Sequence, residues 1–205
     1  MNTSKISTRR YFLIIMSLAS CFYLIPAGAA EQEIERNEPF ISITGSEPVL
    51  HLTEAQTGAI KHYDPTFKLR NRQDYTPDVR KYVRPSAHQI LFAVIGDFNG
   101  DGKKDVVLQG NDDSNELLIA VLSTKEGPRV IDIYKRPFPE AVRNSGINDM
   151  HEDYLSFVPK RKVSSPLENT SVQLKTDAFE VIYFEKASTM YYYDGDKFQT
   201  YMTGD

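Results

Sequence analysis

Residues 97–105 read DFNGDGKKD, and this stretch decides how the chain around it must fold. It lies between two apolar runs, residues 91–95 and 106–108, which are short and rich in Val, Ile and Leu. Short apolar runs bounded by Gly, Asn and Asp are typical of strands rather than helices. The sequence therefore predicts two strands that are joined by a polar turn and belong to an antiparallel sheet.

The turn also carries the side chains of a site for a hard cation. Asp97, Asn99 and Asp101 stand at alternate positions, and Asp105 adds a fourth oxygen-bearing side chain. Lys103 can offer its carbonyl oxygen as a backbone ligand. Oxygen ligands in a flexible ring suit calcium. A polar turn alone needs only one or two such residues, so we predict that these five residues form a calcium site.

An incomplete match to the EF-hand loop bears on the affinity of this site. The six residues from Asp97 match the opening of that loop, but its twelfth position, normally a bidentate Glu, is Leu108. The missing carboxylate predicts weak binding, with a Kd on the order of 10⁻⁴ to 10⁻³ M. Calcium would then stabilise the fold rather than take part in a reaction.

The pattern of strand, D-x-N-x-D-G-x-x-D and strand resembles the calcium loop of FG-GAP and VCBS type repeats, over residues 92–110. In those families the loop joins two strands of a propeller blade and recurs along the chain, so the resemblance implies a calcium-binding hairpin. This chain has the loop once, whereas a propeller needs about four to eight blades. We therefore do not expect a complete propeller. The chain also resembles small exported bacterial proteins that have one such loop and a tyrosine-rich C-terminal strand pair.

The first 30 residues read as a secretory signal peptide. Three basic residues precede an apolar run at residues 11–25, and AGAA at residues 27–30 is a cleavage pattern. We predict cleavage near Ala29 or Ala30, and therefore a periplasmic or extracellular protein. No later apolar run reaches the roughly 20 residues of a membrane span.

A lipid anchor is the alternative reading of the same segment. Residues 18–21 read LASC and resemble a bacterial lipobox, in which Cys21 would be lipidated. The next four residues are still apolar, where lipoproteins usually become polar. Cleavage near Ala29 or Ala30 is therefore favoured over an anchor at Cys21.

Composition limits the partners and the source of stability. Removal of residues 1–30 takes away three basic residues and the one cysteine, so the net charge falls from −4 to −7, with 21 basic and 28 acidic residues. A mildly acidic protein has no electrostatic reason to bind nucleic acid. Without a disulfide the fold must depend on its core, and about 175 residues suffice for one domain.

Two helices are predicted near the N-terminus. Thr53 and Gln56 form a capping box, so a helix should run to about Tyr63. Thr76 followed by proline starts a second, short helix through Tyr82. We expect residues 31–50 to be a flexible leader with a possible short strand at residues 40–43, and residues 67–75 to be a solvated connection.

The rest of the chain predicts strands. Residues 117–122 are apolar at every position, so this strand should be central and covered on both faces. Residues 137–148 should form a loop with a helical turn, and 159–168 an exposed excursion. The predicted fold is α+β, a single domain over residues 51–205 with N-terminal helices against a largely antiparallel sheet. Its strands are 89–96, 105–110, 116–124, 129–136, 153–158, 179–185, 189–193 and 198–202.

Other candidate sites are weaker. The four histidines, His51, His62, His88 and His151, have no partner at metal-ligand spacing. His151, Glu152 and Asp153 could form an acid and base trio, but adjacent residues of an extended chain point apart. Residues 191–193 with Phe198 and Tyr201 could form an aromatic platform for a sugar or peptide, although packing in the sheet is the more common role. Asp194 and Asp196 fit a hairpin turn better than a metal site.

The sequence predicts no catalytic residues and no organic cofactor. We expect an exported, non-catalytic binding or structural module with one calcium loop and an unidentified protein or polysaccharide partner. The alternatives are a hydrolase that acts on the envelope or an extracellular polymer, and a lipid-anchored envelope protein.

Overall fold

Two antiparallel sheets pack face to face in the computed structural model, which describes residues 37–45, 47–138, 150–165 and 170–204. The large sheet has the order β4-β5-β6-β7-β8, and β3 pairs with the end of β6. Its strands are β3 (Lys68–Leu69), β4 (Gln89–Ile90), β5 (Ala93–Gly96), β6 (Asp105–Asn111), β7 (Asn115–Leu122) and β8 (Arg129–Pro137). Each strand from β4 to β8 therefore pairs with the next strand along the chain.

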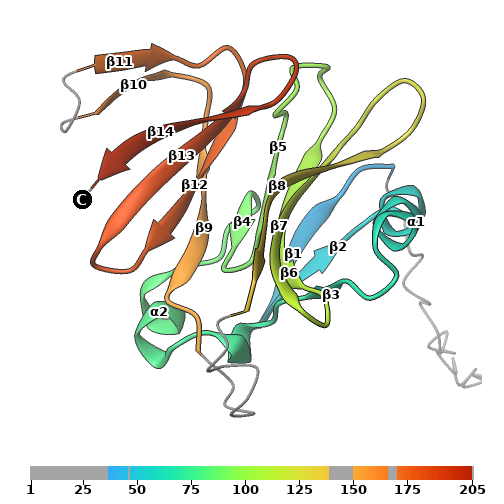
Figure 1. The fold of residues 1–205 in the computed structure, drawn as a ribbon, viewed down its shortest axis with the longest axis horizontal. Coiled ribbons are helices and arrows are strands. Elements are labelled where there is room, and N and C mark those ends of the chain that lie inside the picture. Colours follow the sequence, from blue (N-terminus) through green and yellow to red (C-terminus); the bar gives the residue numbers. More distant parts are fainter. Residues whose placement is uncertain (1–36, 46, 139–149, 166–169, 205) are drawn as a thin grey trace, which may run out of the picture. The chain divides into compact units, whose positions relative to one another are not determined.

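The small sheet comes from the C-terminal part of the chain and has the order β14-β13-β12-β9 (Figure 1). Its strands are β9 (Asp153–Val158), β12 (Ala178–Tyr183), β13 (Ala187–Tyr193) and β14 (Phe198–Gly204). Two hairpins lie outside these sheets: β1 (Phe40–Thr44) with β2 (Glu47–His51), and β10 (Lys162–Ser165) with β11 (Thr170–Gln173). The described residues all belong to one compact unit.

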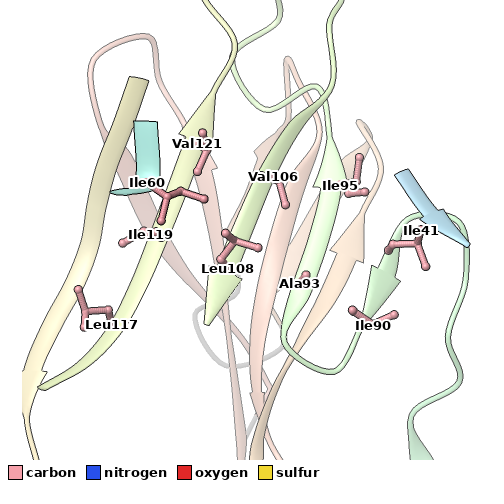
Figure 2. Close-up of a cluster of buried hydrophobic side chains, with 10 residues drawn as sticks. All are labelled: Ile41, Ile60, Ile90, Ala93, Ile95, Val106, Leu108, Leu117, Ile119 and Val121. Atoms are coloured by element: carbon pink, nitrogen blue, oxygen red, sulfur yellow. The ribbon is translucent and has the colours of Figure 1, made fainter. Parts of the chain in front are cut away.

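The central strand β7 is covered on both faces, as its continuous apolar sequence predicted. Successive side chains of a strand point to opposite faces. Leu118 and Ala120 face the small sheet and pack with Leu155 and Phe179. Leu117, Ile119 and Val121 belong to a second core on the opposite face, together with Ile60 of α1 and Ile41 of β1 (Figure 2).

Helix α1 (Glu54–Tyr63) begins where the capping box predicted. The Thr53 hydroxyl group accepts a hydrogen bond of 3.1 Å from the backbone N–H of Gln56, and the backbone N–H of Thr53 donates one of 3.1 Å to Gln56 Oε1. These bonds satisfy two N–H groups that a helix start otherwise leaves without partners. The cap thereby fixes the start of the helix that places Ile60 on the large sheet.

Helix α2 (Pro77–Tyr82) is also present, but it does not cover the same face. Val79 and Val83 pack with Tyr75, Leu91 and Tyr154 in a separate cluster beside the small sheet. With α1, α2 and the three-residue 3-10 helix η1 (Arg72–Asp74) against fourteen strands in the described part, the fold is largely antiparallel β rather than the α+β arrangement that we predicted. It does not form a closed barrel.

Several predicted boundaries need correction. The short strand expected at residues 40–43 is present as β1, but the segment around it is not a flexible leader, because β1 pairs with β2 in a hairpin and Ile41 belongs to the core. The single strand expected at residues 89–96 is a hairpin of β4 and β5. The excursion expected at residues 159–168 contains β10. The signal peptide with Cys21 and the loop expected at residues 137–148, from residue 139 onward, lie outside the described residues.

The two sheets are also joined along one side by hydrogen bonds. The backbone N–H of Leu155, in β9, donates a bond of 2.9 Å to the carbonyl oxygen of Leu91, between β4 and β5. Two residues further on, the N–H of Phe157 donates one of 2.8 Å to the side chain of Gln89. We call this contact of β9 with the β4–β5 hairpin the seam.

Candidate functional site

The loop between β5 and β6 is closed by the carboxylate of its first residue. Asp97 Oδ1 accepts a hydrogen bond of 2.7 Å from the N–H of Gly100, and Oδ2 accepts one of 3.0 Å from the N–H of Gly102. Both glycines have positive φ, 81° and 83°. Residues with a Cβ rarely adopt this conformation, so the two glycines allow the loop to fold back over Asp97.

The next two oxygen-bearing side chains bind the loop backbone in the same way. Asn99 Oδ1 accepts a bond of 2.9 Å from the N–H of Asp101, and Asp101 Oδ1 accepts one of 2.9 Å from the N–H of Lys103. The amide group of Asn99 also donates a bond of 2.6 Å to the carbonyl oxygen of Ser123, which follows β7. The loop is therefore fixed both internally and to the neighbouring hairpin.

Asp105 lies beneath the loop and is fully buried. Its Oδ2 accepts bonds of 2.9 Å and 3.2 Å from the N–H groups of Phe98 and Asn99, and its Oδ1 accepts one of 2.7 Å from the N–H of Ser123. Burial raises the pKa of this carboxyl group to about 7, although the three N–H bonds act to lower it. Asp105 thus holds three backbone segments together.

The side chains of this loop differ in how many oxygen lone pairs remain free to bind a calcium ion. An ionised carboxylate has about four lone-pair positions. Hydrogen bonds occupy two of these positions on Asp97 and one on Asp101, which is exposed. They occupy three positions on Asp105, which is buried. No three His, Cys, Asp or Glu side chains in the described ranges converge as a metal-binding group. A calcium ion here would therefore depend on Asn99 and the Lys103 carbonyl group as well.

A second group of polar side chains lies between the sheets at one end. We call it the buried polar cluster, and it consists of Arg70, Gln109, Glu116, His151 and Asp153. Arg70 is only 2% exposed, and its Nη1 lies 3.3 Å from both carboxylate oxygens of Asp153. Its Nη2 lies 3.6 Å from Glu116 Oε1. Gln109 donates a bond of 2.7 Å to Asp153 Oδ2, so elements of both sheets meet here.

His151 stands beside the two carboxylates of this cluster. Its Nδ1 lies 3.7 Å from Asp153 Oδ1 and 3.8 Å from Glu116 Oε1. Residues two apart on an extended segment share a face, so our expectation that the trio points apart holds only for Glu152, which pairs with Lys186 at 2.6 Å. Burial and the Arg70 guanidinium hold the pKa of His151 below its usual value.

This cluster was not predicted, because residues 67–75 were expected to form a solvated connection. Arg70 is buried instead, and so is Tyr75, whose hydroxyl group donates a bond of 2.8 Å to Gln109 Oε1. One signal was available: Gln109 is polar within an apolar strand. Buried polar side chains nearly always have hydrogen-bond partners, so such a residue indicates that further polar groups lie nearby.

The predicted aromatic platform is divided between two faces of the small sheet. Tyr191 stacks on Phe179 with ring centroids 5.2 Å apart. Tyr192 points the other way, into a cluster that contains Tyr201, whose hydroxyl group accepts a bond of 2.8 Å from the N–H of Ser165. The five aromatic residues therefore do not form one surface.

Two cavities of about 170 Å³ each lie elsewhere in the described structure. One is lined mainly by apolar residues around the β4–β5 hairpin, including Val83, Pro85 and Leu91. The other lies under α1 and is lined by Leu52, Ile60 and Phe67 among others. Neither is lined by a residue of the buried polar cluster or of the Asp97 loop.

Comparison with known proteins identifies no relative from which a function could be taken. No family model matches the chain. No curated protein and no solved structure matches it significantly. In the described part of the chain, no helix is both long enough and apolar enough to cross a membrane.

Proposed function

We propose that this protein is an exported, non-catalytic binding or structural module, periplasmic or extracellular, whose β5–β6 loop binds calcium. The proposed ligands are the side chains of Asp97, Asn99, Asp101 and Asp105 and the carbonyl oxygen of Lys103. The observation that carries the proposal is the alternate spacing of Asp97, Asn99 and Asp101, whose side-chain oxygens turn inward to the loop backbone. Two glycines with positive φ, Gly100 and Gly102, allow this turn.

The ion would stabilise the connection between β5 and β6. Three carboxylates lie within nine residues of chain, and a cation would offset their mutual repulsion. Because the unfolded chain does not hold these residues together, binding would favour the folded state by mass action. At a hundredfold excess over Kd, this amounts to about 2.7 kcal/mol.

A calcium titration of the purified protein tests the proposal. Calcium at about 10 mM, a hundredfold above a Kd of 10⁻⁴ M, should raise the Tm relative to EDTA. Asp101→Ala should abolish this rise but change the Tm in EDTA little, because the exposed Asp101 side chain accepts one N–H bond. Asp113→Ala is the matched control, since Asp113 is an exposed carboxylate in the next turn of the sheet. An unchanged Tm of the wild type would overturn the proposal.

Asp105 should behave differently from Asp101. Asp105→Asn replaces one carboxylate oxygen with an NH₂ group, which cannot accept the N–H bonds that Asp105 receives. The variant should therefore lose stability even in EDTA. A variant that loses only the calcium response would show that Asp105 is a ligand without a structural role.

A hydrolase that acts on the envelope or an extracellular polymer is the second candidate. The position of His151 between Glu116 and Asp153 favours it, since a histidine beside a carboxylate can act as a general acid or base. Release of soluble fragments from peptidoglycan or polysaccharide by the wild type, but not by His151→Gln, would support this function. No release by the wild type would exclude this function for these substrates, and equal release by both proteins would exclude His151 as its catalytic residue.

The partner and the attachment to the envelope can be tested separately. We propose a protein or polysaccharide partner, because the acidic composition gives no reason to expect nucleic acid. A mass spectrum of the mature N-terminus distinguishes cleavage near Ala29 or Ala30 from lipidation of Cys21. A diacylglyceryl adduct on Cys21 would make the protein an anchored module.

A further inference from the structure

His151 and Arg70 face the same two oxygen atoms. Nη1 of Arg70 lies 3.3 Å, and Nδ1 of His151 lies 3.7 Å, from Asp153 Oδ1. Nη2 of Arg70 lies 3.6 Å, and Nδ1 of His151 lies 3.8 Å, from Glu116 Oε1. The distances from His151 are too long for hydrogen bonds. The neutral ring therefore makes no hydrogen bond to either carboxylate, and Arg70 is the cation that contacts both.

Charged groups from several elements surround the His151 ring. Arg70 comes from the connection after β3, Glu116 from β7, Asp153 from β9, and Asp74 from the turn that precedes α2. Arg136 of β8 also pairs with Glu116, at 3.4 Å. Among the described residues, a protonated His151 would thus be a third cation, beside Arg70 and Arg136, facing the carboxylates of Glu116, Asp153 and Asp74.

The hold of Arg70 on the two carboxylates is loose enough to be displaced. Its three contacts with them measure 3.3 to 3.6 Å, whereas charge-assisted N–H bonds are usually about 2.7 to 2.9 Å. Its Nε atom has no hydrogen-bond partner in the described part of the chain. A second cation at the same oxygens would therefore compete effectively.

The backbone of His151 is hydrogen-bonded to the segment that contains α2. Its N–H donates a bond of 2.8 Å to the carbonyl oxygen of Asp74, and its own carbonyl oxygen accepts one of 3.1 Å from the N–H of Thr76. Thr76 is the N-cap of α2, and Val79 of that helix packs with Tyr154 of β9. The side chain of Arg70 and the backbone of His151 thus attach residues 70–83 to the sheets.

We propose that His151 is an acid-sensitive switch: when its ring takes up a proton, it competes with Arg70 for Asp153 and Glu116, and this loosens the attachment of residues 70–83 to the sheets. The switch goes beyond the proposed calcium function and does not use any residue of the Asp97 loop. Mild acidification of the compartment around the protein would then change the surface that α2 presents.

The direction of the pH effect follows from the surroundings of the ring. Because burial and Arg70 lower the pKa of His151, the folded protein resists protonation more than the unfolded chain does. The stabilising effect of the neutral ring is complete above about pH 6.5 and is lost as the pH falls from there toward the folded-state pKa. For a ring that stayed neutral in the folded state, the unfolding equilibrium constant would rise about tenfold between pH 7.5 and 5.5, and protonation of the folded ring, which operates the switch, makes the rise smaller.

Urea unfolding of the wild type, His151→Gln and His62→Gln in EDTA tests the switch. His62 is an exposed histidine of α1 and serves as the matched control. The ratio of the unfolding constants of wild type and His151→Gln should rise by less than about tenfold from pH 7.5 to 5.5 and level off once the folded ring is protonated, and the corresponding ratio for His62→Gln should change less. This comparison cancels the titration of Asp105, which all three proteins share. A constant ratio for His151→Gln would overturn the proposal.

Nuclear magnetic resonance of the wild type gives a test that needs no variant. The exchange rate of the Thr76 N–H, corrected for the intrinsic effect of pH, should rise in step with the titration of the His151 ring. A ring that titrates while the Thr76 N–H stays equally protected would also overturn the proposal. These readouts are independent of calcium, so they can fail while the calcium response is retained.

Discussion

Two hydrogen bonds join Asp97 to Asp177, one to the Asp177 carboxylate and one between their backbones. The N–H of Asp97 donates a bond of 3.1 Å to Asp177 Oδ2, and the N–H of Asp177 donates one of 3.1 Å to the carbonyl oxygen of Asp97. Asp97 begins the candidate calcium loop, and Asp177 directly precedes β12 of the small sheet. The loop of one sheet is thereby attached to the other.

Asp177→Ala should therefore weaken both the fold and the loop. The change removes the acceptor for the N–H groups of Asp97 and Lys160. We expect a loss of about 1 to 2 kcal/mol in the free energy of unfolding, measured in urea. Asp113→Ala should change it by less than about 0.5 kcal/mol, since its ion pair with Lys68 is exposed. Equal effects of the two changes would contradict this role of Asp177.

Arg70→Met should be among the most destabilising single changes. It leaves the carboxylate of Asp153 buried without its cation, and such a loss typically costs about 3 to 5 kcal/mol. Lys68→Met, two positions away, removes an exposed cation and should have little effect. The added change Asp153→Asn should restore part of the stability of Arg70→Met. If the effects of the two changes are additive, the pair is not coupled.

Two glycines should respond in opposite directions to replacement by alanine. Gly58 is exposed in the middle of α1, and a Cβ there meets no atom within 4 Å, so Gly58→Ala should stabilise the protein by about 0.5 to 1 kcal/mol. A Cβ on Gly110 would lie 2.4 Å from the Phe67 ring and 2.6 Å from the carbonyl oxygen of Lys68. Gly110→Ala should therefore lower the Tm, because β3 and its connection must move away. A gain in Tm for both variants would contradict this packing.

Asp112 should contribute to the loss of stability in acid. Burial acts to raise its pKa, but the Lys135 ammonium group at 2.7 Å and the N–H groups of Ser114 and Asn115 outweigh burial and hold the pKa well below its usual range. A depressed folded-state pKa gives stability that is present above about pH 4 and is lost as the pH falls below it.

Asp112→Asn provides the measurement. The variant should be less stable than the wild type by about 2 kcal/mol at pH 7, and the two Tm values should converge between pH 4 and 2. Asp113→Asn, at the adjacent exposed position, should follow the wild type throughout. A difference that stays constant down to pH 2 would mean that the charge of Asp112 does not stabilise the fold.

Local signals in the sequence predicted much of the fold correctly. The capping residues Thr53 and Thr76 start both helices where expected. Asp194 accepts bonds of 2.9 Å and 3.0 Å from the N–H groups of Asp196 and Lys197, so it serves the hairpin turn as its Asp-Gly sequence indicated. These features depend on residues within a few positions of each other, and such interactions can be recognised without the tertiary structure.

Features that depend on distant residues were not predictable in the same way. From the sequence alone Arg70 is expected to be solvated, because its buried partner Asp153 is far away in the chain. For the candidate calcium loop, the sequence indicated the ligand types, but not that Asp105 would be buried under three N–H groups from two separate segments. The β10–β11 hairpin was missed because its strands are short and mostly exposed.

The seam between β9 and the β4–β5 hairpin sets an order for folding. The strands from β4 to β8 each pair with their neighbour in the chain, so this meander closes only short loops, which cost little entropy. The bond from Leu155 to Leu91 closes a much longer stretch of chain and needs both sheets. During synthesis, which proceeds from the N-terminus, the strands of the meander are made before β9. The seam therefore closes after the meander, and during unfolding it can open while the meander remains paired.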